Sequence, residues 1–367
     1  MIPISKPIIG KEETKAVLDV LRSGMLVQGK KTQELERRFA EYCGVQHAVA
    51  LNSGTAAIHA ALYALGIKEG DEVITTPFTF VASANPVLML GAKVVFADIL
   101  PDTFNMDPTC LERAITKRTK AIIPIDLFGL SADYARIQKI ADEHDLFIVE
   151  DACQAHGARF FGRTAGSLGD IACFSFYATK NMMCGEGGMI TTDSPEYAEM
   201  CKRFRHHGQS EQTRYEYYDI GYNYRIMDLT AALALAQLDR LPGFIAARQR
   251  NASLYDEGLA DVPGLTLPKT PKGFDHVYNQ YTILCDNKKV MRDKLAADLK
   301  ELGIGTSIYY PKPLHLHRHF AKLGYKAGDF PVSEEFATMV LSLPVGPHVN
   351  KSDMRTIIST IKKICGA

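Results

Sequence analysis

Short apolar segments alternate with helix-period segments from Val45 to about Ser194, and this alternation constrains the fold more than any other feature. The expected strands are His47–Leu51, Glu72–Thr75, Lys93–Ala97, Ala121–Pro124, Leu146–Val149, Ile171–Phe174 and Met189–Thr192. The helices expected between them include Ala56–Leu65, Ser83–Leu90 and Ala132–His144. Strands that are apolar on both faces and are separated by crossover helices form a mainly parallel sheet flanked by helices. The sequence therefore predicts an α/β fold.

The second half of the chain predicts a further, smaller unit. A long amphipathic helix is expected to start near Met227 or Asp228 and to continue past Pro242, with a kink, toward Leu259. After Pro263-Gly264, the alternation resumes with strands Tyr278–Leu284 and Thr306–Tyr309 and helices Lys289–Leu302, Ser333–Met339 and Lys351–Ile364. We predict a large domain over residues 1–245 and a small C-terminal α/β domain over residues 246–367.

Composition excludes several classes of protein. The chain has 367 residues, of which 46% are hydrophobic, and its 42 basic residues balance its 42 acidic ones. A zero net charge argues against nucleic-acid binding, which favours a basic surface. No apolar run reaches the length of a membrane span, and the N-terminal segment does not resemble a signal peptide. Eight scattered cysteines without a Cys-x-x-Cys pair indicate free thiols, so we expect a cytoplasmic protein.

Two charged residues follow expected strands and suggest a specific cofactor. Lys180 comes after the strand 171–174 and before a glycine-rich run at 185–188, and Asp151 follows the apolar strand Leu146–Val149. Ligands of parallel sheets bind beyond the carboxyl ends of the strands, where both residues fall. Pyridoxal phosphate (PLP) needs a lysine for its Schiff base and a carboxylate that keeps its pyridine nitrogen protonated. The pair predicts a PLP site.

Other residues near the ends of strands fit parts of the same cofactor. Ser53, Gly54 and Thr55 open a helix, whose free amides attract a phosphate, and Ser175 could supplement this cradle. A simple helix cap or a core hydroxyl is the alternative for these residues. An aromatic ring of the segment 76–80 could stack on a planar ring, although core packing is the common role of Phe. Gln154 could reach the phenolic oxygen of PLP or could be an ordinary surface residue.

Two clusters of basic side chains remain ambiguous. His315, His317 and His319 alternate, as three metal ligands on one strand face would. Pro311 and Pro313 instead indicate a loop, and no carboxylate or cysteine joins the set, so we predict no metal site and favour a substrate-lining role. A second group could meet a diphosphate, or could form a solvated loop: Arg205, His206, His207 and Arg214.

The residues of several motifs, taken together, resemble those of a known family. The segments are Glu150–Gly157, Ser167–Asp170, Phe174–Asn181 and Gly185–Gly188. Together they resemble the DegT-type (DegT/DnrJ/EryC1/StrS) sugar-nucleotide aminotransferases, which are fold type I PLP enzymes. The resemblance extends over nearly the whole chain. It implies a large domain with a mainly parallel central sheet and a smaller C-terminal domain.

The resemblance also implies roles for individual residues. Lys180 would form the Schiff base and shuttle the proton, and Asp151 would pair with the pyridine nitrogen. The further cofactor contacts would be Ser53, Gly54, Thr55, Phe80, Gln154, Ser175 and Asn223. Asn223 would contact the cofactor phosphate of a neighbouring subunit, so that a homodimer shares its two sites. The candidates for substrate contact are Tyr309, His315 and Arg225.

The implied reaction moves an amino group from an amino acid, glutamate by analogy, to a nucleotide-linked keto-sugar in the biosynthesis of a polysaccharide or glycan. Relatives that aminate the 3-position tend to have Asn-Ser-Arg where this chain has Asn223-Tyr224-Arg225. We therefore expect amination at C4 of a 4-keto-6-deoxyhexose. The alternatives are a 3-keto-sugar nucleotide, a cyclitol ketone of an antibiotic pathway, or a regulator that binds PLP without catalysis.

Overall fold

The centre of the molecule is a seven-stranded sheet with the strand order β1-β9-β8-β5-β4-β2-β3. The computed structural model describes residues 1–210, 213 and 215–366. The strands of this sheet are β1 (His47–Leu51), β2 (Glu72–Thr75), β3 (Lys93–Phe96), β4 (Thr119–Ile122), β5 (Phe147–Asp151), β8 (Ile171–Ser175) and β9 (Gly188–Thr192). Only β9 runs antiparallel to its neighbours, so the sheet is mainly parallel, and the predicted α/β class is confirmed.

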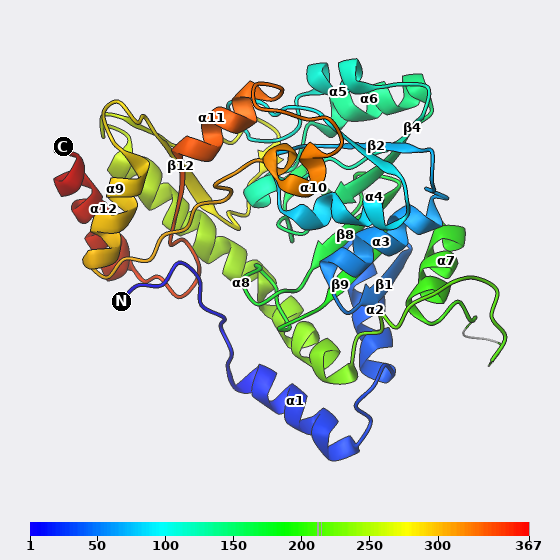
Figure 1. The fold of residues 1–367 in the computed structure, drawn as a ribbon. Coiled ribbons are helices and arrows are strands. Elements are labelled where there is room, and N and C mark those ends of the chain that lie inside the picture. Colours follow the sequence, from blue (N-terminus) through cyan, green and yellow to red (C-terminus); the bar gives the residue numbers. More distant parts are fainter. Residues whose placement is uncertain (211–212, 214, 367) are drawn as a thin grey trace.

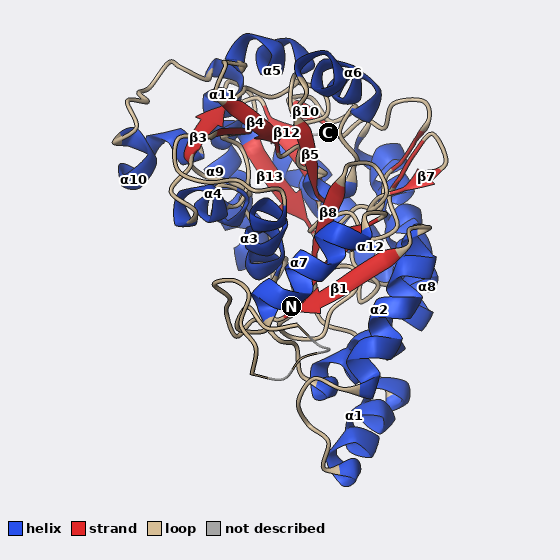
Figure 2. Ribbon diagram, turned by 90° about the vertical axis from the view of Figure 1, so that its right-hand side faces the viewer, coloured by secondary structure: helices blue, strands red, loops and turns tan. Residues whose placement is uncertain are grey.

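Helices cover both faces of the sheet (Figures 1 and 2). One face packs mainly on α3 (Gly54–Ala64), α4 (Asn85–Met89) and α7 (Pro195–Arg205). The other face packs on α2 (Lys30–Cys43), α5 (Pro108–Ala114), α6 (Tyr134–His144) and α8 (Asp228–Leu259). Side chains that alternate along a strand enter opposite cores; in β2, Val73 belongs to the first core and Ile74 to the second. Burial on both faces explains why these strands are continuously apolar.

The helix α8 connects the sheet to the C-terminal part of the chain (Figure 1). It contacts α1 (Lys11–Ser23) and α2 at one end and α12 (Lys351–Cys365) at the other. It contains Pro242, as expected, and passes through the predicted domain boundary after residue 245. A separate hydrophobic core begins at Ala252 and includes α9 (Arg292–Glu301) and α12. The position of the boundary remains a prediction.

The C-terminal part is built on a small sheet with the order β10-β12-β13. Its strands are β10 (Leu265–Thr266), β12 (Tyr281–Cys285) and β13 (Val340–Leu343). A third sheet joins β11 (Phe274–Asp275), β6 (Arg159–Phe160) and β7 (Arg163–Thr164). The remaining helices are α10 (Arg318–Ala321) and α11 (Pro331–Met339). No helix among the described residues combines the length and the apolar composition needed to cross a membrane.

Two expected elements differ in the structure. The segment 306–309 is not a strand: Ser307 makes only an isolated bridge to Ser342, on the edge of β13 that faces away from β12. The helix expected over residues 83–90 is divided into a 3-10 turn, Val81–Ser83, and α4, which has Pro86 in its first turn. Pro86 has no amide hydrogen to donate to the carbonyl of Ala82, so a continuous helical hydrogen-bond pattern is interrupted here.

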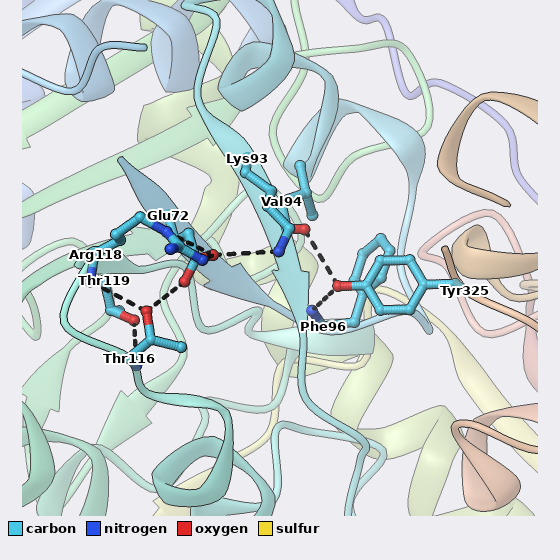
Figure 3. Close-up of polar contacts among 8 residues, drawn as sticks. All are labelled: Glu72, Lys93, Val94, Phe96, Thr116, Arg118, Thr119 and Tyr325. Atoms are coloured by element: carbon cyan, nitrogen blue, oxygen red, sulfur yellow. Dashed lines mark hydrogen bonds and ion pairs between the residues drawn. The ribbon is translucent and has the colours of Figure 1, made fainter. Parts of the chain in front are cut away.

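The amino end of the sheet is held by a buried acid. Glu72 begins β2, and its side chain is only 1% exposed. Its carboxylate lies 3.2 Å from Nζ of Lys93 and 2.7 Å from a guanidinium nitrogen of Arg118, and it accepts a hydrogen bond of 2.6 Å from Thr116 (Figure 3). These groups come from or flank β2, β3 and β4, so one ion cluster ties three strands together.

Tyr325 covers the outer edge of the sheet at β3 (Figure 3). Its hydroxyl donates to the carbonyl of Val94 and accepts from the amide of Phe96, both at 3.2 Å. The two backbone groups belong to the side of β3 that has no neighbouring strand. An edge strand with free backbone groups can pair with another chain. Tyr325 prevents such pairing in β3 because its hydroxyl occupies the carbonyl of Val94 and the amide of Phe96.

Candidate active site

Asp151 and Lys180 lie at the ends of adjoining strands. Asp151 is the last residue of β5, and Lys180 follows β8 in a turn closed by its own amide, which donates to the carbonyl of Tyr177 at 2.9 Å. Burial lowers the pKa of Lys180, and the nearby Cys153 and Asp151 oppose this shift. A lowered pKa increases the fraction of the neutral amine, which is the nucleophilic form. The two residues predicted first from the sequence are therefore neighbours in space.

The carboxylate of Asp151 is buried and receives hydrogen bonds from neutral donors. It is 4% exposed. Oδ2 accepts a 2.6 Å bond from the hydroxyl of Ser83, and Oδ1 accepts a 3.2 Å bond from the amide of Cys153. A buried carboxylate that is oriented by neutral donors is well suited to pair with a cationic group of a ligand.

The predicted phosphate cradle forms where α3 begins. The side chain of Ser53 accepts a 3.1 Å bond from the amide of Ala56 and so caps the helix. A Cβ atom on Gly54 would lie 2.8 Å from Cβ of Ser175 and 3.1 Å from Sγ of Cys153. The start of α3 is thus in close contact with the end of β8, and only glycine allows this approach. The N-terminus of α3 therefore brings together Ser53, Gly54, Thr55 and Ser175. The free amides of such a helix start can bind an anion.

Two phenylalanines of the segment after β2 have opposite environments. Phe78 is completely buried, whereas Phe80 is 57% exposed. The ring of Phe80 lies 6.4 Å from that of Tyr310. Core packing therefore explains Phe78, and Phe80 is the ring that remains available to a planar ligand.

The side chain of Gln154 forms hydrogen bonds with two segments of the chain, one at Phe128 and one at Tyr310. Its Oε1 accepts a 3.0 Å bond from the amide of Phe128, and its Nε2 donates a 3.2 Å bond to the hydroxyl of Tyr310. The alternative of an ordinary surface glutamine is wrong, because the residue is 8% exposed. Sequence reasoning missed both Tyr310 and Ser83 as members of the site, since their contacts join segments far apart in the chain.

The segment 309–319 approaches the sheet from the C-terminal part of the chain. The amide of Leu314 donates to the carbonyl of Pro77 at 2.7 Å. Tyr309 packs against the first core, on the same segment as Tyr310. His315 has no exposed surface, and its Nε2 lies 2.9 Å from Oε1 of Glu334. The structure therefore places His315 in the protein interior against α11, and its role as a substrate contact remains only a prediction.

The segment that holds His315, His317 and His319 is not a strand, in agreement with the reading of its prolines. Leu314–Leu316 is a 3-10 turn and is followed by α10, so the imidazoles do not share a strand face. Within the described part of the chain, no group of three or more His, Cys, Asp or Glu side chains is arranged to hold a metal ion.

The segment 221–225 passes close to the cradle. The carbonyl of Tyr224 accepts from the amide of Asn52 at 2.8 Å, and Arg225 forms a backbone bridge with Leu51. Asn223 is exposed. The segment therefore contacts the end of β1 through its backbone and leads along the chain into α8.

Arg205 does not belong to an exposed diphosphate-binding loop. It is 1% exposed, and its guanidinium donates to the carbonyl of Ala50 at 2.7 Å and pairs with Glu36. The expectation for this residue is wrong, because the C-terminal end of α7 packs against β1. Arg214 lies outside the described residues.

The residues at this edge of the sheet fit PLP. An amine with a lowered pKa, a buried carboxylate without a cationic partner among its hydrogen-bond donors, and a glycine-lined helix start provide the three contacts that the cofactor needs. The exposed ring of Phe80 adds a stacking surface.

Comparison with known proteins agrees with this assignment. Residues 7–362 match the model of the DegT/DnrJ/EryC1/StrS aminotransferase family. The spore coat polysaccharide biosynthesis protein SpsC of Bacillus subtilis is 42% identical, with 99% of this chain and 97% of that protein covered. The dTDP-3-amino-3,4,6-trideoxy-alpha-D-glucose transaminase of Streptomyces venezuelae is 38% identical, with 96% and 92% covered.

A solved structure extends the agreement to three dimensions. A Streptococcus pneumoniae protein in its PLP-form has a TM-score of 0.94 and 32% identity, with 100% of this chain and 98% of that chain covered. The match includes both the central sheet and the C-terminal part. The chain therefore belongs to the DegT/DnrJ/EryC1/StrS aminotransferase family, and it is a PLP-dependent aminotransferase.

Proposed function

We propose that the protein moves an amino group from an amino acid to C4 of a nucleotide-linked 4-keto-6-deoxyhexose in amino-sugar biosynthesis, with L-glutamate as the preferred donor. The observation that carries the proposal is the meeting of Lys180, Asp151 and the Gly54 cradle at one edge of the sheet. Bound PLP supplies an electron sink that stabilises negative charge next to the transferred nitrogen.

The residues of the chain would act as follows. Lys180 holds the cofactor covalently in the resting enzyme. Its Nζ atom would act as the base that moves the proton leaving the donor carbon, a task favoured by its lowered pKa. The carboxylate of Asp151, oriented by Ser83, keeps the ring nitrogen protonated. Ser53, Gly54, Thr55 and Ser175 bind the phosphate, Phe80 stacks on the ring, and Gln154 lies by the phenolic oxygen.

Two observations support a nucleotide-linked sugar as the acceptor. One similar protein is named for spore coat polysaccharide biosynthesis, and another is named as a transaminase of a dTDP-linked amino sugar. The preference for C4 rests on Tyr224, which occupies the position where relatives that aminate C3 tend to have serine. Tyr309 and Arg225 are the proposed substrate contacts.

We also propose a homodimer that shares its two active sites. Apolar side chains near the segment 221–225 are strongly exposed in the single chain: Met25 is 66% exposed, Val27 68% and Ile220 80%. The carbonyl of Leu26 accepts from the amide of Asp228, so the 25–27 segment lies against the start of α8. Exposed apolar side chains on both sides of the segment 221–225 are typical of an interface between proteins. A second copy would cover these side chains and would receive Asn223 at its phosphate site.

The first test is the half-reaction with the amino donor. The purified enzyme is expected to be yellow and to lose its visible absorbance on addition of L-glutamate, whereas Lys180→Ala is expected to have no turnover. Mass spectrometry and NMR of products from a panel of 4-keto and 3-keto sugar nucleotides and cyclitol ketones then identify the acceptor. An enzyme whose absorbance does not respond to any amino donor would disprove amino transfer, and amination of cyclitol ketones alone would disprove the sugar acceptor.

A further inference from the structure

A cluster of aromatic side chains lies directly behind the phosphate cradle. Its centre is His59, on the helix that begins at Gly54, with 1% of its surface exposed. Nδ1 of His59 lies 3.1 Å from the hydroxyl of Tyr224. The imidazole also packs edge-on against Phe204, with 4.9 Å between ring centroids, and Tyr222 stacks on Tyr224 at 4.9 Å.

The backbone around Tyr224 is bonded on two sides. The amide of Tyr224 donates to the carbonyl of Arg205 at 3.0 Å, and that of Tyr222 donates to the carbonyl of Phe204 at 2.7 Å. On the other side, the carbonyl of Tyr224 accepts from the amide of Asn52. The segment is therefore held in an extended form between the end of α7 and the loop after β1.

An extended backbone directs successive side chains to opposite sides. The hydroxyl of Tyr224 reaches His59 in the interior, while Asn223 next to it is exposed. Tyr224 is therefore directed toward α3 and away from the surface that Asn223 occupies. Burial lowers the pKa of His59 to about 4, so the contact joins two neutral groups at neutral pH.

We propose that Tyr224 is a positioning residue that fixes Asn223 relative to the first turn of α3 through its hydroxyl contact with His59, and that it does not contact the sugar. The proposal rests on the proposed function, in which the start of α3 and Asn223 both bind cofactor phosphate. The His59–Tyr224 contact then links the cradle of one site to the residue that serves the site of the second copy. The tyrosine at this position would thus mark the C4-aminating relatives by sequence, while its hydroxyl acts on cofactor retention and does not read the sugar.

The test compares Tyr224→Phe with Tyr222→Phe in the full-length enzyme. Both changes remove one hydroxyl, but among the described contacts only that of Tyr224 has a hydrogen-bonding partner, and Tyr222 is 39% exposed. Loss of one such bond corresponds to roughly a fivefold change in an equilibrium constant. We expect Tyr224→Phe to raise the dissociation constant of PLP about fivefold, measured by absorbance during titration of the apoenzyme, and Tyr222→Phe to leave it unchanged.

Substitutions of His59 provide the second arm. His59→Asn keeps a polar group for the tyrosine hydroxyl and is expected to retain PLP better than His59→Leu. Circular dichroism of each variant checks that it is folded. Equal PLP affinity of Tyr224→Phe and Tyr222→Phe, or of the two His59 variants, would overturn the positioning role.

The position of amination provides the third arm. We expect all these variants to aminate the same carbon as the wild-type enzyme. A changed ratio of C3 to C4 products in Tyr224→Phe would overturn the proposal, because it would mean that the hydroxyl reads the sugar. If the wild-type enzyme aminates no sugar nucleotide, the proposed function fails, while the PLP titrations still decide whether Tyr224 has a positioning role.

Discussion

Glu72 and Asp151 are buried acids at opposite ends of the same sheet, and their surroundings differ. Glu72 begins β2 and is 1% exposed; Asp151 ends β5 and is 4% exposed. Burial alone would raise the pKa of Glu72, but hydrogen bonds from Thr116, Arg118 and Lys93 lower it to about 2. Asp151 instead receives its bonds from the hydroxyl of Ser83 and from a backbone amide.

The difference separates a structural acid from a functional one. The negative charge of Glu72 is neutralised by cations of the chain itself. Asp151 is oriented by neutral donors, so its charge remains available to a partner that the chain does not contain. A buried acid whose oxygens are held by neutral donors beside a lysine with a lowered pKa is the pattern expected of a cofactor site.

The largest expected effect is that of Asp151→Asn on catalysis. The amide can still accept hydrogen bonds from Ser83 and Cys153, but it cannot balance a protonated ring nitrogen. We expect kcat to fall about 10³-fold, the scale of losing one strong electrostatic contact in the transition state. Stopped-flow absorbance of the half-reaction with glutamate measures this, and thermal unfolding serves as the control. A variant with more than a tenth of wild-type activity would remove Asp151 from the mechanism.

Glu72→Gln should show the reverse pattern. We expect a loss of about 2–3 kcal/mol in the free energy of unfolding at pH 7, because the ion pairs that lower the pKa of Glu72 to about 2 are lost, and little change in kcat. A depressed folded-state pKa contributes stability that is present above the unfolded value and is lost as the pH falls. The difference between wild type and variant should therefore shrink between about pH 4.5 and pH 2. Urea unfolding across this range measures it.

A pair of buried acids, Glu150 and Asp126, extends the comparison to the pH range between about 4.5 and 7. Glu150 accepts from the amides of Gly166 and Leu168 at 2.6 and 2.8 Å, and Asp126 accepts from Ala132 and Tyr134; neither acid has a cationic partner among these donors. Burial raises the pKa of Glu150 to about 7 and that of Asp126 well above its usual range.

Raised folded-state pKa values mean that the folded chain binds a proton that the unfolded chain releases. Stability should therefore fall as the pH rises from about 4.5 to 7. The amide of Asp126→Asn can donate to Glu150 without binding a proton. We therefore expect the loss of stability between pH 5.5 and pH 8 to be smaller in the variant than in the wild type, by on the order of 1–2 kcal/mol. Thermal unfolding at pH 5.5 and pH 8 measures the change. Identical slopes for wild type and variant would show that the pair does not share a proton.

The smallest expected effect is that of Ser83→Ala. Removal of the 2.6 Å bond to Asp151 should lower kcat about tenfold, since one hydrogen bond to a charged group is worth roughly 1.5 kcal/mol at the lower end of its range. Thr79→Val is the matched control, because its hydroxyl lies 3.1 Å from Ser83. Steady-state kinetics with saturating donor distinguish the two. If both variants lose activity equally, the hydroxyl network rather than the bond to Asp151 is responsible.

Local patterns in the sequence predicted what depends on local chemistry. The strands of the central sheet follow from apolar runs, and Lys180, Asp151 and the Gly54 turn follow from their places after those strands. Ser83 and Tyr310 could not be predicted, because their contacts join Asp151 and Gln154 across 68 and 156 residues of chain. The strand β13 was also missed, because it continues directly from α11 without a glycine or proline to mark the change.

Tyr325 also has a consequence for the order in which the chain is completed during synthesis. The hydroxyl that covers β3 belongs to a residue 229 positions after Phe96. All seven strands of the central sheet are translated by residue 192, well before Tyr325 leaves the ribosome. A sheet that forms as its strands emerge would keep an open edge at β3 until Tyr325 is made, and a chaperone that binds exposed strands could act on that edge in this interval.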